Sequence, residues 1–72
     1  MSPKLPVLSG FELIKALKQM GYYVRRQKGS HVRLYHPDRK PVTVPLHKTL
    51  DRKTLQTILK IVEISVEELF PQ

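Results

Sequence analysis

The chain of 72 residues contains 13 Lys and Arg but only 6 Asp and Glu, and its formal net charge is +7. A chain this short buries only about 60% of its unfolded surface, which excludes a second domain, and the absence of cysteine excludes disulfides and thiolate metal sites. No segment has the apolar stretch of a signal peptide or the roughly 20 apolar residues of a membrane span, so we expect a single cytoplasmic domain over residues 1–72, with an ordered core at about 8–70 and no membrane partner.

The first predicted element is a helix over residues 10–21, after a loose lead-in over residues 1–7. Ser9 and Glu12 form a capping box, in which each side chain accepts from the backbone N–H of the other residue. Gly21 can take the left-handed conformation after the last turn. The helical spacing places one apolar stripe on the core side, made of Phe11, Ile14, Leu17 and Met20.

A β-hairpin is predicted next, with strands at residues 22–27 and 31–36 and a turn at 28–30. Side chains alternate with a period of two along a strand. Alternation directs a first set toward the core: Tyr22, Val24, Val32 and Leu34. The opposite, exposed face receives Tyr23, Arg25, Gln27, His31, Arg33 and Tyr35. On that face, Tyr23 and Tyr35 fit equally well as a cross-strand pair or as platforms for bases.

The rest of the chain adds a third strand and a second helix. Residues 37–41 form a turn, and Pro45 closes a short strand over residues 42–44. Asp51 caps a helix whose apolar stripe is Leu55, Ile58, Leu59 and Val62. A second capping box, Ser65 with Glu68, predicts a short terminal helical turn. The fold class is therefore α+β, a two-layer α-β-β-β-α arrangement with a three-stranded antiparallel sheet and helices on one face.

The basic residues are clustered rather than spread along the chain. Between Lys15 and Arg39 the only acidic residue is Asp38, whereas acidic residues dominate after Lys60. A face kept only for solubility would mix both signs more evenly. The clustering therefore favours binding to phosphates.

His31 follows the Gly29-Ser30 turn and has Arg26, Lys28 and Arg33 as near neighbours in the sequence. An exposed His can act as an acid or a base near neutral pH. In RNA, the 2′-hydroxyl can attack the adjacent phosphorus if a base takes its proton and cations bind the phosphoryl oxygens. The residues alone, however, favour a passive role for His31, as an ordinary strand residue or a hydrogen-bond donor to phosphate.

A family resemblance changes this weighting. Successive landmarks of the chain resemble those of the HicA toxins: Ser9-Gly10-x-Glu12, Gly21-Tyr22, Arg26-Gln27-Lys28-Gly29-Ser30-His31, Val44-Pro45-x-His47 and Leu55-x-x-Ile58-Leu59. The resemblance implies a fold like that of double-stranded-RNA-binding domains. It also implies the toxin of a type II toxin–antitoxin pair, which cleaves mRNA without a metal, and a HicB-type antitoxin that blocks the site. Two departures concern the second helix, because the family has Gly where this chain has Lys53 and Glu63.

The candidate site follows from the residues and the resemblance together. His31 is the candidate catalytic acid or base. The candidate RNA-binding residues are Arg25, Arg26, Lys28, Gly29, Ser30, Arg33, Tyr35 and His47. No cofactor or metal is predicted, since a zinc site built from His31, His36 and His47 would have irregular spacing. Two alternatives stay open: a non-catalytic module that binds double-stranded RNA, and a chain without nuclease activity whose main ligand is a HicB-like partner.

Overall fold

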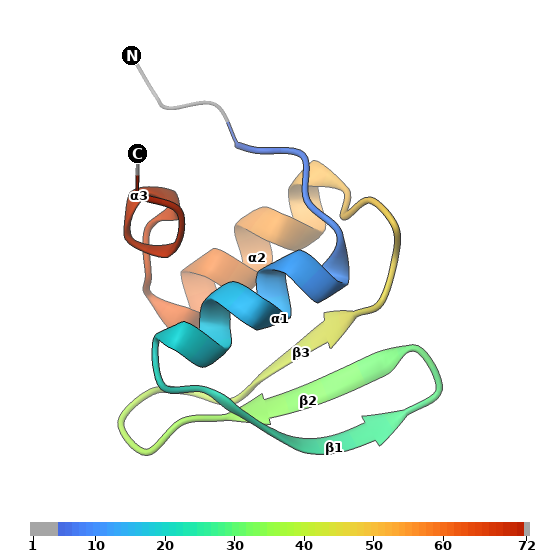
Figure 1. The fold of residues 1–72 in the computed structure, drawn as a ribbon, viewed down its shortest axis with the longest axis vertical. Coiled ribbons are helices and arrows are strands. Elements are labelled where there is room, and N and C mark those ends of the chain that lie inside the picture. Colours follow the sequence, from blue (N-terminus) through green and yellow to red (C-terminus); the bar gives the residue numbers. More distant parts are fainter. Residues whose placement is uncertain (1–4, 72) are drawn as a thin grey trace.

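Two helices lie on one face of a three-stranded sheet in the computed structural model, which describes residues 5–71 (Figure 1). The elements are α1 (Gly10–Gln19), β1 (Tyr23–Lys28), β2 (His31–Tyr35), β3 (Val42–Pro45), α2 (Arg52–Val62) and α3 (Val66–Leu69). The strands are antiparallel in the order β1-β2-β3. This confirms the α+β class and the predicted α-β-β-β-α order, with α3 as the short terminal helix. Within residues 5–71, no helix has the length and apolar character needed to cross a membrane.

Both hydrogen bonds of the predicted capping box are present at the start of α1. The Ser9 N–H donates to Glu12 Oε1 at 3.0 Å, and the Glu12 N–H donates to Ser9 Oγ at 3.1 Å. The buried residues of the helix are Gly10, Leu13, Ile14, Ala16 and Leu17. The prediction for Phe11 was wrong, because its side chain is 66% exposed. The buried stripe is centred on the 10–13–17 side of the helix, which leaves Phe11 beside it.

The N-terminus of α1 packs directly on the chain that leaves β3. The Gly10 N–H donates to the His47 carbonyl oxygen at 2.9 Å. A Cβ atom on Gly10 would overlap the carbonyl oxygen of Pro45. Glycine is therefore required here by close approach, and the contact fixes α1 against the end of β3.

His36 was expected to be exposed at a turn, and this expectation was wrong. Its ring is half-buried, lies 4.8 Å from the Tyr22 ring, and bonds to the Met20 carbonyl oxygen through Nε2 at 2.9 Å. The Asp38 N–H donates to Nδ1, so the neutral ring protonated on Nε2 satisfies both bonds. A Cβ on Gly21 would lie 2.8 Å from Nε2, and the φ of Gly21 is +101°. The expected left-handed glycine thus also makes room for His36.

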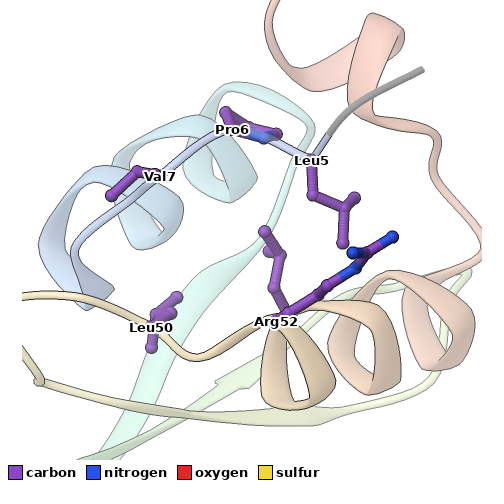
Figure 2. A pocket seen from close by; sticks show the side chains of 6 residues that line it. Leu5, Pro6, Val7, Leu50 and Arg52 are labelled. Atoms are coloured by element: carbon purple, nitrogen blue, oxygen red, sulfur yellow. The ribbon is translucent and has the colours of Figure 1, made fainter.

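The described chain before α1, residues 5–9, has no helix or strand. Residues 5–7 run beside the start of α2, where Leu5, Pro6, Leu50 and Arg52 line a groove of about 360 Å³ (Figure 2). The Leu50 N–H donates to the Leu8 carbonyl oxygen at 2.7 Å. The expectation for residues 1–4 concerns a part of the chain outside the described residues.

The two ends of α2 use different devices. At the start, the Asp51 carboxylate accepts from the Thr54 N–H at 3.3 Å, which confirms the predicted cap. At the end, Glu63 takes the left-handed conformation, with a φ of 55°. Arg39 donates from Nη1 to the carbonyl oxygens of Val62, at 2.9 Å, and Glu63. Arg39 therefore stabilises the end of α2 and connects it to the turn after β2.

The strained conformation of Glu63 predicts a stabilising substitution. The left-handed backbone conformation costs a residue with a Cβ atom roughly 1 kcal/mol of free energy, whereas glycine adopts it freely. We expect Glu63→Gly to raise the free energy of unfolding by about 1 kcal/mol in urea denaturation followed by circular dichroism. Glu63→Ala is the matched control, since it removes the carboxylate but keeps the strain. A loss of stability in Glu63→Gly, or an equal gain in both variants, would contradict this account.

The cap of α2 predicts a pH dependence. Hydrogen bonds from Thr54, above all from its side chain, hold the pKa of Asp51 below its ordinary value. A lowered pKa in the folded state gives stability that is complete above the unfolded pKa of about 3.9 and is lost as the pH falls through the folded value. Asp51→Ser keeps a capping oxygen that does not titrate. We expect the wild-type protein to lose stability relative to Asp51→Ser between about pH 5 and about pH 2.5. Urea unfolding curves of both proteins at about pH 5 and about pH 2.5 measure the difference between their free energies of unfolding. If the carboxylate has no role, this difference should be the same at the two pH values.

Candidate nucleic-acid interface

A β-bulge at Arg25 determines which side chains of β1 share a face with β2. Val24 pairs with Leu34, but the next pair is Arg26 with Arg33, so Arg25 is an extra residue in the ladder. A bulge of this kind sets two residues of one strand opposite one residue of the other. Arg25 and Arg26 consequently both line the open face of the sheet.

The bulge reverses the alternation for the rest of β1. Gln27 pairs with Val32 and, together with Val24 and Ile14, lines a shallow hollow on the helix side. The prediction that Gln27 shares a face with His31 was therefore wrong, because simple alternation contains no bulge. Val24, which was predicted to point into the core, lies on the helix side but is 42% exposed. Lys28 pairs with His31 and lines the open face instead.

The turn between β1 and β2 contains only Gly29 and Ser30. Gly29 has a φ of +58°, and a Cβ atom on it would meet nothing within 4 Å. Glycine is needed here for the conformation of a tight hairpin turn, while the space above the turn is open. The Ser30 carbonyl oxygen accepts from the Leu46 N–H at 2.6 Å. This bond ties the turn to the segment after β3, which also contacts α1.

The open face of the sheet contains a depression of about 490 Å³, which we call the basic depression. Its lining is Arg25, Arg26, Lys28, His31, Arg33, Tyr35 and Thr43, without any carboxylate. All of these side chains are exposed except Thr43, which is half-buried. Such a concentration of positive charge attracts polyanions and raises their local concentration.

Two contacts orient the side chain of Arg33 in the basic depression. Its Nη1 donates to Thr43 Oγ1 at 3.0 Å, across the β2–β3 ladder. Its guanidinium carbon lies 5.8 Å from the centre of the Tyr35 ring, and that of Arg25 lies 5.9 Å from the same ring. Thr43 was not among the predicted site residues. Its position opposite Arg33 depends on the register of β3, which the sequence does not state.

His47 does not join the predicted group. It lies two residues beyond Pro45, the partner of His31 in the ladder, and does not line the basic depression. Its side chain is exposed, and it makes the smallest of the contributions that lower the pKa of Asp51. The Ser30 side chain is exposed at the turn, and the structure assigns it no hydrogen bond.

The arrangement combines an imidazole with fixed cations on an open surface. Arginine and lysine can hold phosphoryl oxygens, and an imidazole can accept or donate a proton near neutral pH. Among residues 5–71, no three His, Cys, Asp or Glu side chains gather where they could hold a metal ion.

Comparisons with known proteins agree with the observed fold. A family model described as "HicA toxin of bacterial toxin-antitoxin" matches residues 10–64. A solved chain from a toxin–antitoxin complex of Streptococcus pneumoniae is similar, with a TM-score of 0.69 and 29% sequence identity. That alignment covers 79% of this chain and 98% of the other. No curated protein sequence matches the chain. The residues matched by the family model include every strand that lines the basic depression.

Proposed function

The chain belongs to the HicA toxin family of bacterial toxin–antitoxin systems, and from that premise we propose that it cleaves mRNA at the basic depression, with His31 as the acid–base residue. The proposal rests on the position of His31 in the structure. It lies exposed among Arg25, Arg26, Lys28 and Arg33, with no carboxylate beside it. A polyanion that settles on these cations brings its phosphates to the imidazole.

The proposed reaction uses the nucleophile that RNA itself supplies. His31 accepts the proton of a 2′-hydroxyl while the 2′-oxygen forms a bond to the adjacent phosphorus. The bond from phosphorus to the 5′-oxygen breaks, and that oxygen takes up a proton from the solvent. The products are a 2′,3′-cyclic phosphate and a 5′-hydroxyl. Arg26, Lys28 and Arg33 bind the phosphoryl oxygens, whose negative charge increases toward the transition state. DNA lacks the 2′-hydroxyl and is not a substrate.

A protein partner belongs to the proposal as well. The similar pneumococcal chain comes from a toxin–antitoxin complex. We infer that an antitoxin of the HicB type binds this chain in the cytoplasm and covers the basic depression. A partner with acidic side chains at that position would neutralise the charge of these cations and exclude RNA.

Removal of the imidazole should slow cleavage strongly without abolishing binding. We expect His31→Ala to cleave labelled RNA at least about 100-fold more slowly than the wild-type protein, since acid–base groups contribute about 10²–10⁴-fold. The assay is run in EDTA, with DNA of the same sequence as the substrate control, and the 2′,3′-cyclic phosphate ends are detected. The wild-type protein should cut only the RNA.

Binding measurements on the same variant separate the possible explanations. His31→Ala should bind RNA with nearly unchanged affinity, because the neighbouring cations remain. Equal cleavage by the variant and the wild-type protein would refute the role of His31. Binding without cleavage by the wild-type protein would favour the non-catalytic RNA-binding module.

The cations of the basic depression should determine the salt dependence of binding. Each phosphate contact contributes about 0.7 to the slope of log K against log salt for a single strand. We expect Arg26→Gln to reduce the magnitude of that slope by roughly 0.7 and to weaken binding to all RNA sequences alike. Lys60→Gln is the matched control, because it also removes one charge but lies exposed on α2, away from the basic depression. Equal slopes for the two variants would show that only the net charge matters.

A further inference from the structure

Tyr35 is an exposed aromatic ring whose surroundings resemble a platform for a base. Tyr35 is 38% exposed as a whole residue and ends β2. The guanidinium carbons of Arg25 and Arg33 lie over the ring, 5.9 and 5.8 Å from its centre. The ring centres of Tyr23 and Tyr35 lie 6.5 Å apart, and the two ring planes are tilted by 43°. These neighbours fix the position of the ring without burying it.

The position of Tyr35 along β2 relates it to His31. His31, Arg33 and Tyr35 follow one another on the same face at every second residue, about 6.8 Å apart in an antiparallel strand. A nucleic-acid chain that runs along β2 would therefore meet the imidazole first, then a guanidinium and then an aromatic ring. The ring lies about 14 Å from His31 along the strand, a distance that a short run of nucleotides spans.

We propose that the basic depression selects single-stranded RNA, and that Tyr35 stacks on an unpaired base near the phosphate that reacts at His31. Bases in a duplex are already stacked on their neighbours and present only their edges, so they cannot cover the Tyr35 ring. An unpaired base can, when the two guanidinium groups that lie over the ring swing onto its flanking phosphates. The inference rests on the proposed function because it takes the basic depression as the RNA site.

The test measures binding separately from cleavage. The probe is a 2′-O-methyl oligonucleotide, which lacks the 2′-hydroxyl nucleophile, either alone or annealed to its complement. We expect the wild-type protein to bind the single strand roughly 5- to 150-fold more tightly than the duplex, the range that stacking of one base provides. Tyr35→Ala should lose this preference, and Tyr35→Phe should keep it. Phe11→Ala is the control, because Phe11 is an exposed ring that lines the helix-side hollow.

A spectroscopic readout distinguishes stacking from a structural effect. We place 2-aminopurine at successive positions of the single strand and measure its fluorescence on binding. At one position, the wild-type protein and Tyr35→Phe should quench the fluorescence, whereas Tyr35→Ala should not. Circular dichroism of each variant verifies the fold. Equal affinity for single strand and duplex, or quenching that survives Tyr35→Ala, would overturn the proposal.

The outcome is distinguishable from that of the proposed function. A protein that binds single strands through Tyr35 but never cleaves RNA would support this inference and refute the nuclease. A protein that cleaves RNA through His31 but binds duplex equally well would have the opposite meaning.

Discussion

The bulge at Arg25 is the constraint on which the basic depression depends. Without the extra residue, strict alternation would direct Arg26 and Lys28 to the helix side of the sheet, under α1. With it, Arg25, Arg26 and Lys28 all lie on the face that carries His31 and Arg33. One additional residue in one strand thus concentrates charge that the sequence distributes over consecutive positions, and bulges commonly re-aim side chains in this way.

Local signals explain why so much of the fold could be predicted. Ser9 with Glu12, and Ser65 with Glu68, form their capping boxes within one helical turn, so the sequence contains all the parts of each device. The core positions of Val32 and Leu34 follow from alternation within β2, which has no bulge. The face that Gln27 occupies depends on the bulge in β1, and the burial of His36 depends on Met20, which is 16 residues away. The register of β3 brings Thr43 opposite Arg33, and His47, which was predicted to bind RNA, does not line the basic depression.

The helix layer covers the sheet unevenly, and this positions the site. α1 and α2 pack mainly against β3, which is the strand nearest to them in Figure 1. Every residue of β1 remains exposed, so its pairing with β2 keeps this strand in place. The bond from Leu46 to Ser30 and the contact of Gly10 with Pro45 connect the hairpin turn to β3 and α1. The residues that carry the proposed chemistry thus lie on the β1–β2 hairpin, whose turn is held by the segment after β3.

The absence of a carboxylate among the cations of the basic depression has a consequence for the free protein. Arg25, Arg26, Lys28 and Arg33 repel one another across a small area, and such self-repulsion opposes the compact state. A bound polyanion removes this repulsion, so the ligand-free form is the less stable of the two. Robustness of the fold and affinity for anions therefore oppose each other on this face. Neutralising one of these side chains would raise the stability of the free protein and lower its affinity for an anion, a trade-off common at functional sites.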